Sequence, residues 1–179
     1  MQSKTSKTFQ NLKPLKLIHK SMTVILIIGK WDFRRRFLNE NPNTEVDEEY
    51  RVAEAAMRVQ FPKALIINPC RYFYSLPVAD PDDLKGQASI FQLYKKKVDK
   101  IHRLVMMGAF SRLVLLDDWF YFPEANMALT MLAEGYKQKF YERKPVVSLL
   151  SDDLKEIGRE RLAKMAEAEH SSKRQLNSD

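Results

Sequence analysis

The chain has 179 residues, of which 45% are hydrophobic and only five are glycine, so it suits one globular domain with short extensions and excludes a collagen-like or linker protein. The formal net charge is +7, yet residues 1–21 contain five lysines and no acidic residue, which leaves the rest of the chain nearly neutral. A nucleic-acid-binding domain usually carries a basic face on its folded part, so nucleic-acid binding through the basic tail is not the favoured interpretation.

Cysteine and histidine usage argues against disulfides and metal sites. Cys70 is the single cysteine, which is typical of a protein in a reducing compartment, and the three histidines are scattered. We therefore expect neither a metal nor another cofactor. The apolar run at residues 24–28 is too short for a signal-peptide core or a membrane span, which favours a cytoplasmic protein without a membrane partner.

Four apolar segments alternate with helical patterns. Continuous apolarity predicts strands buried on both faces, at residues 23–28, 64–68, 112–116 and 145–150. Apolar residues at helical spacing predict helices at residues 44–60, 89–107, 123 to about 136 and 152 to about 168. This order predicts an α/β fold with a parallel sheet of four to five strands, covered by helices on both faces.

The same patterns divide the chain into three parts. Residues 1–21 are expected to form a basic, disordered tail, and residues 22–150 the α/β domain. Residues 151–179 are expected to form a charged helix with a frayed end. The narrow apolar stripe of that helix would suit pairing with a second copy, so a homo-oligomer is one expectation.

In open parallel sheets, ligands bind beyond the carboxyl ends of the strands, where the strand order reverses. The loops that follow the predicted strands are rich in aromatic, cationic and carboxylate side chains, which can stack on a base and hold a phosphate. We therefore expect a nucleotide or nucleoside ligand. The alternative is that these loops form no ligand site and that their aromatic rings simply pack against one another. The candidate ligand-binding residues are Gly29, Lys30, Trp31, Arg34, Arg35, Asn68, Arg71, Asp117, Trp119 and Asn126.

Known catalytic and phosphate motifs are absent from the sequence. It contains no GxGxxG and no GxxxxGK[ST]. Cys70 and His102 do not make a convincing catalytic pair, because Cys70 is expected to be a small buried residue and His102 to lie on a helix surface. Asp117 and Asp118 follow an apolar strand, where they suit a ribose, a metal ion or simple end-of-strand capping.

The order of several features resembles a known family. They are Gly29 after the first strand, Val52-Ala53-Glu54-Ala55, Ile67-Asn68-Pro69, a lysine-rich helix, Asp118-Trp119, Ala125 and Gly135. This order is similar to a family of short phage and bacterial proteins of unassigned function, which themselves resemble nucleoside 2-deoxyribosyltransferases and deoxynucleoside-monophosphate N-glycosidases. The similarity covers roughly residues 22–140, and its most specific parts are residues 67–69 and 115–119.

The resemblance implies a flavodoxin-like three-layer sandwich, a nucleotide-type ligand and, for a phage-encoded protein, the host cytoplasm. In the enzymes, a carboxylate on the helix after the third strand attacks the anomeric carbon of deoxyribose, and a second carboxylic acid helps the base to leave. Carried over by this resemblance, Glu124 is the candidate nucleophile and Asp118 the candidate acid.

The chain departs from the family's pattern in three places. Lys30 stands where a proline is usual, Ser111-Arg112 stands where an acid usually precedes the third strand, and the expected helix glutamate falls nearest Ala128, one turn beyond Glu124. These departures leave two alternatives open. One is a non-catalytic phage protein that sequesters a nucleotide. The other is a protein- or nucleic-acid-interaction module that uses the basic tail and the C-terminal helix.

Overall fold

The computed structural model describes residues 22–30, 44–74, 82–117, 119–140 and 143–176. These residues form an α/β fold with a four-stranded, all-parallel sheet in the order β2-β1-β3-β4. The strands are β1 (Val24–Ile28), β2 (Leu65–Ile67), β3 (Arg112–Leu115) and β4 (Val146–Leu149). The predicted fold class is confirmed, and the topology is consistent with a flavodoxin-like three-layer sandwich.

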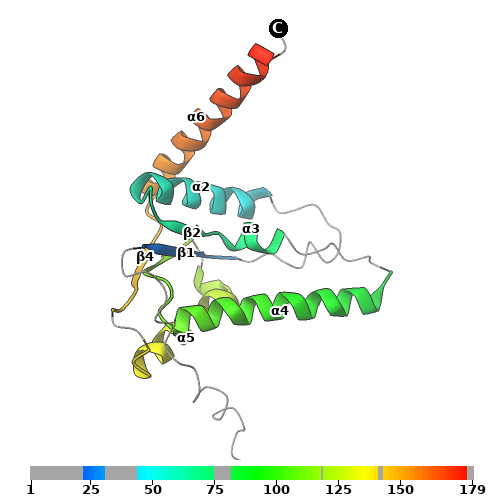
Figure 1. Cartoon of the computed structure of the whole chain (residues 1–179), viewed down its shortest axis with the longest axis vertical. Helices are drawn as coiled ribbons and strands as arrows, with labels where there is room; N and C mark the ends of the chain where they lie inside the picture. The colour runs from blue at the N-terminus through cyan, green and yellow to red at the C-terminus, as the bar shows by residue number, and fades with distance from the viewer. Residues whose placement is uncertain (1–21, 31–43, 75–81, 118, 141–142, 177–179) are drawn as a thin grey trace, which may run out of the picture.

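Helices cover both faces of the sheet (Figure 1). They are α2 (Thr44–Gln60), α3 (Pro69–Tyr74), α4 (Leu84–Met106), the 3₁₀ turn η1 (Trp119–Tyr121), α5 (Pro123–Lys137) and α6 (Asp152–Leu176). Helix α6 packs against α2, and α5 packs against α4 on the other side of the sheet. The C-terminal half of α6 extends away from the body of the molecule (Figure 1), and residues 163–173 are exposed. None of the described helices is long and apolar enough to cross a membrane.

Strand β1 is the centre of the hydrophobic core. All five of its residues are buried, and it pairs with β2 on one side and β3 on the other. Burial of a large aliphatic side chain is worth about 1.5–3 kcal/mol, which explains why a run of five consecutive aliphatic residues takes the central position. The chain crosses to β2 on one side of β1 and returns to β3 on the other, so the strand order reverses between β1 and β3.

The secondary structure differs from the sequence-based prediction in the segments around these strands. Residues 69–74 and 119–121, which were expected to be loops, form α3 and η1. Helix α4 begins at Leu84, five residues before the predicted start, because the Asp83 carboxylate accepts hydrogen bonds from the N–H groups of Lys85 and Gly86 (3.1 and 3.0 Å). Helix α6 continues to Leu176, beyond the predicted end near residue 168.

Candidate functional site

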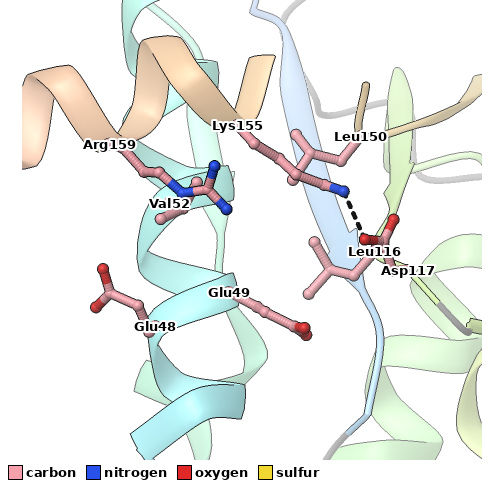
Figure 2. A pocket seen from close by; sticks show the side chains of 8 residues that line it. All are labelled: Glu48, Glu49, Val52, Leu116, Asp117, Leu150, Lys155 and Arg159. Atoms are coloured by element: carbon pink, nitrogen blue, oxygen red, sulfur yellow. Dashed lines mark hydrogen bonds and ion pairs between the residues drawn. The ribbon is translucent and has the colours of Figure 1, made fainter. Parts of the chain in front are cut away.

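A cavity of about 360 Å³ lies at the carboxyl edge of the sheet, between α2 and the first turns of α6 (Figure 2). Leu116 and Leu150, which directly follow β3 and β4, and Val52 of α2 supply its apolar surface. We call this cavity the edge pocket. Its charged lining residues are Glu48, Glu49, Asp117, Lys155 and Arg159.

Helix α6 brings both cations of the edge pocket to one side. Lys155 and Arg159 are four residues apart on α6, so they lie on the same face of the helix. Gly158 allows α6 to approach α2 closely, because a Cβ atom at this position would overlap the backbone carbonyl oxygen of Val52. The helix crossing at Gly158 therefore sets the position of both cations.

Lys155 is held by two carboxylates. Its Nζ donates to Oδ2 of Asp117 (2.5 Å) and to Oδ1 of Asp152 (3.0 Å), and its side chain is only 18% exposed. The hydrogen bond to Asp117, and then that to Asp152, raises the pKa of Lys155 above its ordinary value of 10.5, against the opposing effect of burial. Lys155 is therefore a charged residue that fixes the Asp117 side chain at the mouth of the pocket.

Arg159 differs from Lys155 because no described residue makes an ion pair or hydrogen bond with its guanidinium. Figure 2 shows its side chain pointing into the space between α6 and α2. Glu48, across the pocket, is instead paired with Arg51 at 3.5 Å. A guanidinium presents a planar fork of donors that matches a phosphate or carboxylate, so Arg159 gives the edge pocket a binding group for an anion.

Two of the predicted ligand-binding residues lie at or directly beneath the edge pocket. Asp117 lines it. Gly29 follows β1 and packs under Leu116, since a Cβ atom on Gly29 would lie 2.8 Å from Cδ1 of Leu116. The absence of a side chain at Gly29 therefore makes room for a residue that lines the pocket.

Three other predicted residues meet around the segment between β3 and α5. Nζ of Lys30 lies 5.9 Å from the ring centroid of Phe122, and Trp119 is partly buried against the core. Nδ2 of Asn126 donates to the carbonyl oxygens of Phe120 (2.9 Å) and Phe122 (3.2 Å), which fixes the turn before α5. Phe120 is exposed on this turn, and its ring offers a stacking surface beside the carboxyl edge.

Asn68 and Arg71 belong to a separate polar cluster around the buried carboxylate of Glu54. Oε2 of Glu54 accepts from Nδ2 of Asn68 and Nε of Arg71, both at 3.0 Å, and Oε1 accepts from Arg58 at 2.8 Å. Oδ1 of Asn68 accepts from the N–H of Cys70 and so caps α3. We call these residues, Glu54, Arg58, Asn68 and Arg71, the Glu54 cluster.

The Glu54 cluster and the edge pocket lie on opposite flanks of α2. Val52 faces α6 and the pocket, and two residues further along an α-helix the side-chain direction has turned by roughly 200°. Glu54 consequently points away from the pocket. The structure therefore does not bring Asn68 and Arg71 together with Asp117.

The remaining predicted site residues fall outside the described part of the chain. They are Trp31, Arg34, Arg35 and Asp118. Glu124 is the second residue of α5, and its side chain is likewise not described. Among the described residues, no group of three or more histidine, cysteine, aspartate or glutamate side chains could hold a metal ion.

Sequence reasoning missed four charged residues of the edge pocket: Glu48, Glu49, Lys155 and Arg159. The prediction searched for site residues only in the loops that follow strands. The last of these loops is Ser151, one residue before α6 begins. A usable signal was Gly158, because a glycine inside a charged helix often marks close packing against another element. That contact would have placed the first two turns of α6 beside α2.

The chain was also compared with known proteins. No family model matches it, and no match was found among the curated proteins or the solved structures.

Proposed function

We propose that the protein binds a nucleoside or nucleotide at the carboxyl edge of its sheet, in the edge pocket. The observation that carries this proposal is the guanidinium of Arg159, which has no partner among the described residues and lies in a cavity of about 360 Å³ beside the reversal of strand order. Open parallel sheets bind ligands at this place, and small-molecule pockets start at roughly 300 Å³.

The chemistry of the lining fits the parts of such a ligand. Arg159 suits a phosphate, with a bidentate contact. The carboxylate of Asp117, fixed by Lys155, suits the hydroxyl groups of a sugar, because a carboxylate accepts hydrogen bonds from several directions. The apolar surface of Val52, Leu116 and Leu150 suits the ring faces.

A thermal-shift panel of nucleosides, deoxynucleoside monophosphates and cyclic nucleotides tests the proposal. A ligand that binds only the folded state raises the Tm by mass action, by an amount that grows with its concentration. We expect phosphorylated ligands to give the larger shift, and this excess to disappear in Arg159→Ala. No shift with any ligand at millimolar concentration would contradict the proposal.

Arg71→Ala is the matched control, because Arg71 is the one arginine among the candidate ligand-binding residues that lies in the described part of the chain. If Arg71→Ala and not Arg159→Ala removes the phosphate-dependent shift, the phosphate is bound at the other flank of α2.

Cleavage of the N-glycosidic bond is the reaction that the family resemblance implies, and we carry it as part of the proposal. The Glu124 carboxylate would attack C1′ of the deoxyribose, the C1′–N bond would break, and the base would leave with a proton from Asp118. Water would then release the sugar. We expect slow release of free base that is lost in Glu124→Gln and retained in Glu134→Gln, a matched change on the same helix.

A second candidate function is binding without cleavage. Ser111 stands where the resembling enzymes have an acid, and here its hydroxyl bonds the backbone of Val24 in both directions, at 2.7 and 3.0 Å. This position therefore holds the sheet together and supplies no carboxylate. Recovery of the bound ligand unchanged after long incubation would select this function over the enzyme.

A further inference from the structure

Helix α4 carries a large excess of positive charge. It contains six basic residues and one acidic residue, Asp99, while α5 beside it contains one basic and two acidic residues. On the other face of the sheet, α2 contains five acidic and two basic residues, and α6 contains six of each (Figure 1). The nearly neutral charge of the chain beyond residue 21 therefore conceals an uneven distribution, with the positive excess on the α4 side of the sheet.

Five of the six cations of α4 lie on its outward side, and all five are exposed. We call them the basic face: Lys85, Lys95, Lys96, Lys100 and Arg103. At about 100° per residue, Lys85, Lys96 and Arg103 point within roughly 20° of one direction, and they span about 27 Å of the helix. Lys95 and Lys100 point to either side of this row. Ile101 and Val105 are buried on the opposite side of α4, against the core.

The basic face has no electrostatic partner within the described part of the chain. None of its five side chains makes an ion pair with a described residue, and neither does Asp99. Lys96 and Lys100 are one turn apart, and Arg103 follows three residues later, so like charges are neighbours on the helix surface and repel each other. A bound polyanion would remove this repulsion.

The geometry of the basic face favours duplex DNA as that polyanion. The major groove of B-DNA is about 12 Å wide and admits an α-helix, with phosphates along both sides. Lys95 and Lys100 diverge from the central row, as contacts to two phosphate strands require. A row of about 27 Å spans roughly eight base pairs of B-DNA. The deep, narrow major groove of duplex RNA is not accessible in this way.

Two other polyanionic surfaces fit the basic face less well. Proteins that bind single-stranded nucleic acid stack the bases on aromatic rings, and the basic face contains no aromatic residue. A helix that binds a membrane surface presents an apolar stripe beside its cations. Phe91 and Leu93 are exposed on α4, but they point in directions about 160° apart and so form no single stripe.

We propose that α4 binds duplex DNA, with the basic face in the major groove and its cations on the phosphates. The binding has no sequence preference, because contacts to phosphates carry no sequence information. The five lysines of residues 1–21 add to the same attraction. The proposal does not depend on the ligand of the edge pocket, because α2 and α6 lie on the other face of the sheet.

Fluorescence anisotropy of the full chain with a labelled random-sequence DNA duplex tests the proposal. We expect Lys96→Gln/Arg103→Gln to weaken binding by about tenfold to a hundredfold at about 0.1 M salt. The slope of log Kd against log salt concentration should fall by about two, one for each lost phosphate contact. Circular dichroism checks that the fold is retained.

Two controls separate the basic face from net charge. Lys164→Gln/Lys173→Gln removes the same charge from the exposed half of α6 and should leave the Kd within about twofold of the wild type. Lys96→Arg keeps the charge on α4 and should retain the affinity. Arg159→Ala should bind the duplex as the wild type does, because Arg159 belongs to the edge pocket.

Two further arms separate the tail and the other polyanions. Lys13→Gln/Lys16→Gln, within residues 1–21, should weaken binding less than Lys96→Gln/Arg103→Gln does. In competition, unlabelled duplex DNA should displace the probe more effectively than duplex RNA, single-stranded DNA of the same length or phosphatidylserine vesicles.

Four results would overturn the proposal. The first is no binding of the duplex at low salt and high micromolar protein. The second is an equal loss of affinity in the α4 and α6 double variants, which would mean that net charge alone is responsible. The third is a loss that is confined to the variant in residues 1–21. The fourth is stronger competition by duplex RNA, single-stranded DNA or vesicles than by duplex DNA.

Discussion

The Glu54 cluster and the edge pocket, on either side of α2, both combine carboxylates with cations and are expected to do different things. In the Glu54 cluster, a carboxylate that is 4% exposed has hydrogen-bond partners for both oxygens. In the edge pocket, Lys155 is paired with Asp117, but Arg159 faces a cavity without a partner among the described residues. A structural cluster therefore differs from a candidate binding site in whether its polar groups already have their hydrogen-bond partners, and not in their charge.

The largest expected effect comes from breaking the Glu54 cluster. Glu54→Ala removes the shorter of the two hydrogen bonds that Nδ2 of the buried Asn68 donates and leaves only the one to the carbonyl oxygen of Tyr50 at 3.5 Å, while the exposed Arg58 and Arg71 regain water. We expect a loss of about 2–3 kcal/mol of unfolding free energy, because a buried polar group that keeps only a long hydrogen bond is costly. Urea unfolding measures this loss. Ligand binding by the folded fraction should be unchanged, and a selective loss of binding would mean that the two flanks are not independent.

The next effect comes from separating α6 from α2. Gly158→Ala sets a methyl group against the carbonyl oxygen of Val52 and forces the helices apart. We expect a net loss of about 1–2 kcal/mol, since overpacking outweighs the better helix propensity of alanine. Ligand affinity should fall as well, because Lys155 and Arg159 move with α6. Ala163→Gly, at an exposed position of the same helix, is the control, because it lowers helix propensity without changing the contact between α6 and α2.

Arg159→Ala is expected to affect binding without affecting stability. An exposed side chain that pairs with no described residue is expected to contribute within about 0.5 kcal/mol to unfolding. Loss of a charge-assisted hydrogen bond to a phosphate should weaken a nucleotide by roughly tenfold to a hundredfold, and the matching nucleoside much less. Chemical denaturation and calorimetric titration of the same samples measure both. A variant that is destabilised would show that Arg159 has a structural partner.

The smallest effect concerns pH. The pKa of Lys155 is raised in the folded state, so its ion pairs stabilise the fold fully below the ordinary value of 10.5, and this stabilisation is lost as the pH rises through the higher folded pKa. We expect Lys155→Met to be less stable than the wild type by less than about 1 kcal/mol at neutral pH. The difference should shrink towards zero in strongly alkaline solution. Lys164→Met, on an exposed part of α6, should show no such pH-dependent difference.

The architecture was largely predictable from the sequence because its signals are local. Continuous aliphatic runs marked the four strands, and the spacing of Val46, Tyr50, Ala53 and Met57 gave both ends of α2 correctly. The short turn η1 was missed although its hydrogen bonds from Asn126 to Phe120 and Phe122 are local. The helix α3 was missed because its cap depends on a contact with another element. The α3 cap, for example, is an asparagine whose amide is held by Glu54, fourteen residues earlier.

The candidate site was predictable only in part, for the same reason. Asp117 followed from the rule about the carboxyl ends of parallel strands, and it lines the edge pocket. Lys155 and Arg159 did not follow from it, because their position depends on how α6 crosses α2. That crossing is decided by the fit of Gly158 against Val52, a contact between residues more than one hundred positions apart.

The edge pocket is proposed to bind a nucleotide through Arg159. Its most direct test is calorimetric titration of a deoxynucleoside monophosphate and its parent nucleoside into the wild type and Arg159→Ala. We expect that the wild type prefers the monophosphate and that this preference disappears in the variant. An unchanged preference in Arg159→Ala, or no binding of either ligand to the wild type, would contradict it.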